Sequence, residues 1–517
     1  MKDKFKDILH SKLSLSAYIL SGIWLLLYFA LGAAIFSKMW NTSPALPFFG
    51  AVLAFLPLVA LVLNTALGRN RIVEILVICA CPALALLYFF FFAFVLSKLN
   101  YFLIEGAPYF ITAGLFAFVA FFVFAFPRLN KLFKRISAIG ISVIIFIICL
   151  VCLFDATPFY ISGGTTVFAV DDEYQIAFAT SHKSIASVTV GDTVYYDQTN
   201  GQNNVSTLHK ISVPASELES SREYSINTQG VILNYAYLPS NGIKIQKSYP
   251  FRPVDESDGL QIYNLSDTHE CVSGPAHAGI WFNDKLDLLI LNGDIINDVS
   301  SEYQISLIYK LAHSITGGKV PVIYTRGNHE CNGKLANDFG KYVGCAERGF
   351  YYTYKAGSLS MVVLDTNNDM ADDKALIRPI ANFAEVRKQE SEWLKNLDWQ
   401  DGQYNFVIAH MAYPLSGYVS DNCHWSGWAK ELISLTDGAD LALCGHSHKT
   451  DYAEVGTWDN AIANYPVLRG SIRSNRYSDR EGVSPAEFTG TAIEIKDGKI
   501  NVKFTNTKKQ ILKEFNV

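Results

Sequence analysis

The sequence carries little net charge and lacks any stretch in which basic residues alternate with aromatic ones. With 43 Lys and Arg against 48 Asp and Glu, its formal net charge is −5. Proteins bind nucleic acids through concentrated positive charge, so no nucleic-acid partner is expected. The 517 residues also lack internal repeats and long low-complexity tracts, which excludes a repeat array. No feature indicates a protein partner.

Cysteine is scarce, and none stands inside the polar strings described below. Of the nine cysteines, four fall in apolar stretches of the first third, where they act as small apolar residues. The other five leave at least one thiol unpaired in a monomer. A Cys331–Cys345 disulfide is left open by the spacing. We interpret the five as buried or paired residues and not as metal ligands; they are Cys271, Cys331, Cys345, Cys423 and Cys444.

Half of the residues are hydrophobic and the mean hydropathy is +0.17, with the excess in the first third. Five apolar stretches there each approach the roughly 20 residues that cross a bilayer, which predicts a membrane bundle over residues 1–155. Buried core helices are the alternative, but little polar sequence lies between the stretches to solvate them. The stretches are Leu15–Phe36, Ala45–Leu67, Ile72–Leu96, Pro108–Phe126 and Ile136–Phe154.

Basic residues are distributed unequally between the two sides of the predicted membrane. Ten lie in segments on the same side as the N-terminus and two on the opposite side. The positive-inside rule then predicts a cytoplasmic N-terminus, and an odd number of spans places everything after Phe154 outside. We therefore expect a multi-pass plasma-membrane protein with the bilayer as a partner. Five spans exceed what an anchor requires, which hints at a lipid-linked or membrane-derived substrate.

Two further regions follow. Between residues 160 and 255, short alternating runs are broken by Gly, Asn, Asp and Ser, which predicts a small antiparallel sandwich. It would serve either as a spacer or as a substrate-binding module. From residue 256 to the C-terminus, strand-like runs alternate with helical patterns, which predicts a layered α/β domain.

Five polar strings in the α/β region each follow a short apolar run that reads as a strand. Ligands just past the carboxyl ends of buried strands are usual in α/β folds. The strings supply carboxylates, one amide oxygen and imidazoles but no thiolate, a set that suits two divalent cations such as Mn, Fe or Zn. They are Asp267-Thr268-His269, Gly293-Asp294, Gly327-Asn328-His329-Glu330, His410 and Gly445-His446-Ser447-His448.

The order and spacing of these strings resemble the calcineurin-like metallophosphoesterase superfamily, from about Asp255 onward. The resemblance implies two facing sheets flanked by helices, and hydrolysis of phosphate esters by a hydroxide that bridges two metals. It implies that Asp294 bridges both metals, that His329 is the general acid, and that Glu330 orients it or packs structurally. The first metal would be held by Asp267, His269, Asp294 and His448, and the second by Asp294, Asn328, His410 and His446.

Two further residues are candidates for substrate contacts. In the serine/threonine phosphatase branch an Arg at the position of Arg326 reaches the phosphate; pairing with a nearby carboxylate is the equal alternative. His424 lies on a loop that could form the pocket rim, although a surface role is the alternative.

Residues 160–255 look similar to the fibronectin-like domain that precedes the catalytic domain of purple acid phosphatases. The sequence departs from that subfamily at Asn297, where the iron-binding tyrosine is expected, so ferric chemistry is not predicted. Asn297-Asp298-Val299 also differs from the Asp-Arg-Gly of protein phosphatases.

The sequence therefore predicts a membrane-anchored, outward-facing dinuclear phosphoesterase in three parts, 1–155, 160–255 and 256–517. One alternative is a non-catalytic sensor that binds a phosphorylated ligand at the metal site. Another is a transporter with an accessory outer domain, although the apolar stretches carry few of the ionisable residues that transport pathways need.

Overall fold

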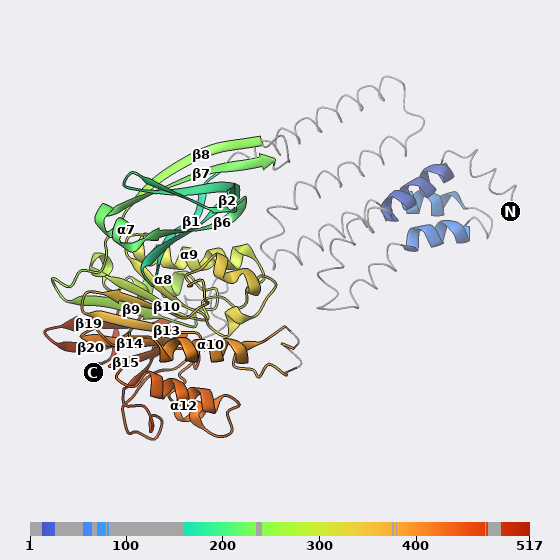
Figure 1. The fold of residues 1–517 in the computed structure, drawn as a ribbon. Coiled ribbons are helices and arrows are strands. Elements are labelled where there is room, and N and C mark those ends of the chain that lie inside the picture. The colour runs from blue at the N-terminus through green and yellow to red at the C-terminus, as the bar shows by residue number, and fades with distance from the viewer. Residues whose placement is uncertain are drawn as a thin grey trace. The chain divides into compact units, whose positions relative to one another are not determined.

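The computed structural model describes residues 13–25, 55–64, 70–78, 80–81, 159–233, 240–374, 377–378, 380–470, 472–473 and 488–517 (Figure 1). The chain divides into two compact units, Met1–Ala156 and Thr157–Val517. In the described part of the first unit, Leu20, Trp24 and Leu61 belong to one small buried cluster.

The N-terminal unit requires a correction to the sequence prediction. Its described helical stretches cover 13–25, 55–64 and 71–78, and no described helix combines the length and apolar character needed to cross a membrane. The predicted five-span bundle and plasma-membrane location are contradicted by this finding, and the outward orientation rested on the same spans. Hydropathy counts apolar residues but does not show where a helix begins and ends. The predicted spans Pro108–Phe126 and Ile136–Phe154 lie outside the described residues.

A 13-stranded sheet dominates the second unit. Its centre is parallel: β10 pairs with β9 on one side and β11 on the other. Every residue of β10 and β11 is buried, as expected for strands covered on both faces. The bounds are β9 (Leu260–Leu265), β10 (Leu288–Asn292), β11 (Pro321–Thr325), β18 (Ile472–Arg473), β19 (Phe488–Lys496), β20 (Lys499–Asn506) and β21 (Ile511–Asn516).

Most strands of the segment predicted as a sandwich belong to this sheet, while β4 and β5 form a two-stranded sheet of their own. β1 pairs in parallel with β11, with Val167 opposite Pro321, and the strand order continues through β2, β7 and β8. The alternating pattern identified the strands correctly, but a local sequence pattern does not specify which other strand each of them pairs with. The bounds are β1 (Ile161–Val170), β2 (Glu173–Val190), β3 (Thr193–Tyr196), β4 (Gln198–Thr199), β5 (Gln202–Asn203), β6 (Ser206–Pro214), α7 (Ala215–Ser221), β7 (Glu223–Leu233) and β8 (Ser240–Pro250).

A second sheet has six strands in the order β12-β13-β14-β15-β17-β16. Alternate residues of β13 serve two cores, as the two-residue period of a strand requires. Met361 and Val363 join the core that includes the large sheet, whereas Val362 and Leu364 join a second core. The bounds are β12 (Tyr352–Ala356), β13 (Leu359–Leu364), β14 (Tyr404–Ala409), β15 (Leu441–Cys444), β16 (Thr450–Ala453) and β17 (Val467–Gly470).

Helices cover the outer faces of both sheets, so the α/β fold expected for the catalytic part is confirmed. Figure 1 shows α8 and α9 beside β10, and α10 and α12 beyond β13–β15. In α9 the predicted apolar face, Ile305, Ile308 and Leu311, is fully buried. The bounds are α8 (Ser273–Gly279), η1 (Asn283–Lys285), α9 (Glu302–Thr316), η2 (His329–Cys331), η3 (Ala336–Lys341), α10 (Phe383–Lys395), α11 (Ser416–Val419) and α12 (Ser426–Leu435).

Candidate metal centre

All of the predicted ligand residues lie on loops that follow parallel strands of the two sheets. β9, β10 and β11 supply one half of the centre, and β14 and β15, also parallel, supply the other. Two sheets that face one another thus present their carboxyl ends to the same place. Asp267 and His269 follow β9, Asp294 follows β10, Asn328 and His329 follow β11, His410 follows β14, and His446 and His448 follow β15.

Asp267, His269 and His448 form one group whose ligand atoms could hold a cation. Nε2 of His448 lies 3.3 Å from Nε2 of His269 and 3.6 Å from Oδ1 of Asp267. The other oxygen of Asp267, Oδ2, accepts hydrogen bonds from the Ser266 hydroxyl at 2.5 Å and the His446 backbone N–H at 3.1 Å. Oδ1 is therefore the atom left for a cation.

Asp294, His410 and His446 form a second group. Oδ2 of Asp294 lies 3.3 Å from Nε2 of His410. Oδ1 of Asn328 lies 2.9 Å from Nδ1 of His446, which adds the predicted amide ligand. The Nδ1–H of His410 donates to the Asn292 carbonyl at 2.8 Å, so Nε2 is turned toward the centre, as is usual for metal-binding histidines.

His329 joins a third group with His269 and Asp294, so Asp294 belongs to two of the three groups. The Nδ1–H of His329 donates to the Asn297 carbonyl at 2.8 Å. Its Nε2 lies 3.9 Å from Oδ2 of Asp294, and its side chain is 37% exposed. His329 therefore presents Nε2 to the centre while its ring remains open to solvent.

The donor atoms fit divalent cations on two observations. First, Oδ1 of Asp267 and Nε2 of His410 are buried and have no hydrogen-bond partner. A buried polar atom without a partner costs about 1–3 kcal/mol, and a cation between the ligands would satisfy both atoms. Second, oxygen and imidazole donors without thiolate suit Mn, Fe or Zn.

Backbone strain is also concentrated in the ligand loops. A left-handed backbone costs a residue with a side chain about 1–3 kcal/mol, and such strain clusters at functional sites. The φ angles are 56° at Asp267, 47° at His269, 52° at Asp294, 66° at His446 and 51° at His448.

Burial and opposing charges shift the protonation of the ligands. Burial raises the pKa of Asp267 to about 7, although the His410 imidazole opposes this. Burial lowers the pKa of His446 to about 4. Burial also acts to lower the pKa of His410, yet Asp294 and Asp267 outweigh it and raise this pKa to about 10. Since a ligand must lose its proton to bind a cation, metal binding releases protons from Asp267 and His410.

Glu330 holds two ligand loops together through backbone hydrogen bonds, a role more specific than the sequence predicted. Its Oε2 accepts from the N–H groups of Asp294 and Gly327, both at 2.9 Å. Its Oε1 accepts from Ile295 at 2.7 Å and Ile296 at 3.1 Å. Glu330 is fully buried, and burial raises its pKa.

Asparagines that sequence reasoning missed orient several of these groups. Oδ1 of Asn297 lies 3.1 Å from Nδ1 of His269, while the Asn297 carbonyl holds His329. Asn332 donates to the Asn328 carbonyl at 2.8 Å, and Asn368 donates to Asn332 at 3.2 Å. The only sequence signal was the position of Asn297, three residues after Asp294.

Arg326 is paired with a carboxylate, the alternative left open by the sequence. Its Nη2 lies 2.5 Å from Oδ2 of Asp365 and its Nε 3.2 Å from Oδ1. The guanidinium lies 4.4 Å from the centroid of the Phe350 ring, and the side chain is 12% exposed. The Nε and Nη2 donors of Arg326 are therefore used by Asp365, which is not one of the predicted metal ligands.

His424 lies in the loop between α11 and α12 and is exposed. Aromatic rings connect this loop to the ligands: Tyr418 lies 6.5 Å from His446 and 5.3 Å from Trp425, between ring centroids. His424 contacts Trp425 at 6.1 Å. Tyr418, which the sequence analysis did not single out, is thus nearer to the ligands than His424 in this chain of rings.

Cys331, Cys345, Cys423 and Cys444 are free thiols in the structure, and Cys271 forms no disulfide. None belongs to the three groups of ligand atoms found among the described residues. The Cys331–Cys345 disulfide left open by the spacing is therefore not formed here.

Comparisons with known proteins agree with this geometry. Residues 260–450 match the model of the calcineurin-like phosphoesterase family. A search of curated proteins found no match. Among solved structures, a purple acid phosphatase from yellow lupin (Lupinus luteus) seeds is 14% identical with a TM-score of 0.45, covering 68% of this chain and 73% of its own. A structure of PhoD is 11% identical with a TM-score of 0.39, covering 68% and 92%. Residues 260–450 are thus similar to a calcineurin-like phosphoesterase domain, their ligand groups could hold divalent metal ions, and the protein is a metal-dependent phosphoester hydrolase.

Proposed function

We propose that this protein hydrolyses phosphate monoesters with two divalent cations held side by side. The observation that carries the proposal is the position of Asp294. It belongs to one group with His410 and His446 and to another with His269, and His269 is also a member of the group with Asp267 and His448. A carboxylate has two oxygens and a full negative charge, so it can be shared by two cations. Asp267, His269 and His448 would complete one site. Asn328, His410 and His446 would complete the other.

Bound cations would supply Lewis acidity, which lowers the pKa of water from about 16 toward about 7 and neutralises charge on the phosphate. The protein residues would hold and orient the ligands and move protons. Asn292 and Asn297 fix the rings of His410 and His269 through hydrogen bonds to Nδ1. This leaves Nε2 of each ring for a cation.

His329 is suited to donate a proton to the leaving oxygen. Its Nδ1–H is engaged by the Asn297 carbonyl, so a proton on Nε2 faces the centre. Partial exposure allows the ring to regain a proton from solvent after each turnover. The leaving alkoxide would depart as an alcohol with the Nε2 proton.

The test is turnover of a panel of phosphate monoesters and diesters by the full chain, after chelation and after addition of Mn²⁺, Fe²⁺ or Zn²⁺. Asp294→Asn should lower turnover at least about 100-fold and reduce bound metal, since an amide bridges two cations poorly. Asp284→Asn, at an exposed carboxylate in η1, is the matched control and should keep both. An Asp294→Asn protein that retains two metals and normal turnover would refute the shared-carboxylate arrangement.

A further inference from the structure

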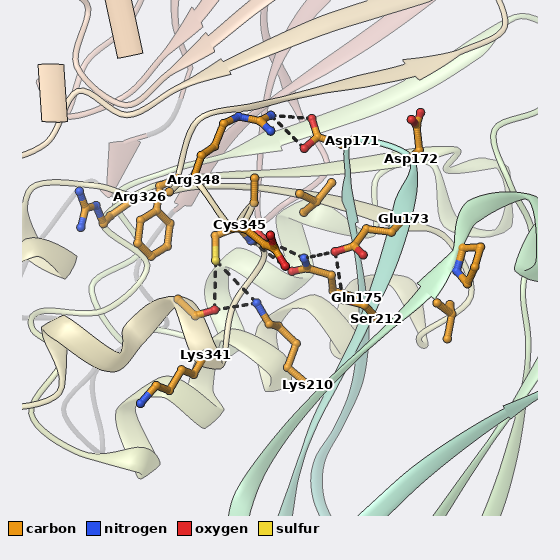
Figure 2. A pocket seen from close by; sticks show the side chains of 18 of the residues that line it. Asp171, Asp172, Glu173, Gln175, Lys210, Ser212, Arg326, Lys341, Cys345 and Arg348 are labelled. Carbon is orange, nitrogen blue, oxygen red and sulfur yellow. Dashed lines mark hydrogen bonds and ion pairs between the residues drawn. The ribbon is translucent and has the colours of Figure 1, made fainter. Parts of the chain in front are cut away.

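Lys210, in the middle of β6, directs its amine into the loop 336–350 and not into solvent. Nζ donates to the Gly340 carbonyl at 2.6 Å and to the Val343 carbonyl at 2.9 Å. The same nitrogen lies 3.6 Å from Sγ of Cys345 (Figure 2). The amine therefore has two neutral acceptors and a sulfur as its nearest neighbours, and the Glu173 carboxylate acts on it through its charge alone.

Cys345 is held in place from both sides of its backbone. Its N–H donates to Oε1 of Gln175 at 3.2 Å, and its carbonyl accepts from Nε2 of Gln175 at 2.8 Å. Sγ also lies 3.0 Å from the Gly340 carbonyl. Because β2 carries Gln175 and the neighbouring strand β6 carries Lys210, one sheet positions both the thiol and the amine.

The pair lines a pocket of about 1080 Å³ that lies outside the metal centre. Figure 2 shows the Cys345 sulfur beside the Lys210 amine and joined to it by a dashed line, with Glu173 and Arg348 farther along the wall. Cys345 is partly exposed. A small oxidant dissolved in water can thus reach the sulfur, whereas Cys444 is fully buried.

The amine is suited to act as a nucleophile. Burial lowers the pKa of Lys210, although the nearby Cys345 opposes this. Deprotonation leaves two N–H groups, and two carbonyl acceptors lie within hydrogen-bond distance to receive them. The nitrogen lone pair is then available toward the neighbouring sulfur.

We propose that Lys210 and Cys345 form a reversible covalent link under peroxide, a sulfenamide bond between Nζ and Sγ. In the first step the thiol attacks hydrogen peroxide: the O–O bond breaks, sulfur is oxidised by two electrons to a sulfenic acid, and one water leaves. In the second step the neutral amine attacks that sulfur; the N–S bond forms, the S–O bond breaks, and the hydroxyl leaves with an amine proton as a second water. Added thiol reverses the link by exchange at sulfur.

The test is peptide mapping of the full chain after brief exposure to hydrogen peroxide and alkylation of the remaining thiols. A linked peptide should contain Lys210 and Cys345 at the summed peptide mass less two hydrogen atoms. Trypsin should fail to cleave after Lys210 in that fraction, and dithiothreitol should restore cleavage. The yield should be several-fold greater at pH 8.5 than at pH 6.5, because the amine and the thiol both react deprotonated.

Variants separate this link from ordinary thiol oxidation. Lys210→Arg keeps the charge and the carbonyl contacts but offers a poor nucleophile; its Cys345 should accumulate as a sulfenic acid that dimedone traps. Cys345→Ser should give no link. Cys423, another partly exposed free thiol, is the internal control and should not be found joined to a lysine. If wild-type Cys345 is oxidised to sulfenic or sulfinic acid without any linked peptide, the proposal is wrong. The wild-type result decides even if Lys210→Arg folds poorly.

Discussion

The carboxylate of Glu330 accepts the backbone N–H of Asp294 at 2.9 Å, so a buried acid holds the residue that two groups of ligand atoms share. The same carboxylate accepts three further backbone N–H groups. A carboxylate can satisfy four donors because each oxygen has two lone pairs. Glu330 therefore acts on the metal centre through the backbone.

Replacing Glu330 should destabilise the fold and weaken metal retention. Glu330→Gln places an amide NH₂ against backbone N–H groups, which leaves buried donors unpaired at about 1–3 kcal/mol each. We expect the free energy of unfolding to fall by about 2–6 kcal/mol in denaturant titrations, since two donors lose their acceptor. Glu347→Gln, at an exposed site, should change it little. Equal stability of the two variants would show that the four hydrogen bonds contribute nothing.

The role of His329 can be tested by comparing substrates that differ in their leaving group. An alkyl alkoxide needs a proton as it departs, and general-acid catalysis is worth roughly 10²–10⁴-fold. A nitrophenolate departs without one. His329→Asn should therefore slow alkyl phosphate hydrolysis far more than nitrophenyl phosphate hydrolysis, with metal content unchanged.

His277→Asn, at an exposed histidine of α8, is the control and should affect neither substrate. Losses of similar size for both leaving groups in His329→Asn would indicate a structural role. A loss of metal in addition would make His329 a ligand.

Metal affinity should rise with pH. In the metal-free protein the pKa of Asp267 is raised to about 7 and that of His410 to about 10. Both groups hold protons more tightly in the folded than in the unfolded chain, so the stability they provide is present at low pH. It is lost as pH rises through these values. Loading both cations displaces both protons, one at each site. The product of the two affinities should therefore rise about 100-fold per pH unit below pH 7 and about tenfold per unit between 7 and 10.

Competition with a chromophoric chelator at pH 6, 7 and 8 would measure this dependence. Asp267→Asn removes one of the two protons, so below pH 7 the product of the two affinities should rise only about tenfold per unit. An affinity independent of pH would contradict the assignment of these two residues as ligands.

Arg326 provides the fourth prediction. If it serves the fold through Asp365, Arg326→Lys should lower the free energy of unfolding by about 1–3 kcal/mol, because lysine cannot reproduce the bidentate pair. KM for phosphate esters should then be nearly unchanged. Arg348→Lys alters a more exposed pair with Asp171 and should cost less than about 1 kcal/mol. A large rise in KM with unchanged stability would instead place Arg326 on the substrate.

The ligand loops were predictable because each polar string follows an apolar strand, and parallel strands bring their carboxyl ends to one edge. The contacts of Asn297 and Asn332 could not be predicted, because they involve carbonyl groups whose direction depends on the conformation of the loops. The pairing of β1 with β11 joins segments about 150 residues apart, and no local pattern encodes such a partner. The membrane prediction rested on hydropathy alone and is contradicted because no described helix is long and apolar enough to cross a membrane.

The two halves of the metal centre belong to different hydrogen-bonded sheets, one ending in Asp267, Asp294 and Asn328 and the other in His410 and His446. No complete set of ligands exists until both sheets have folded and docked. Metal binding is therefore expected late in folding, after residue 448 has been synthesised and packed. Bound metal would mark finished molecules, and a partly assembled chain would be poorly able to capture or retain the cations.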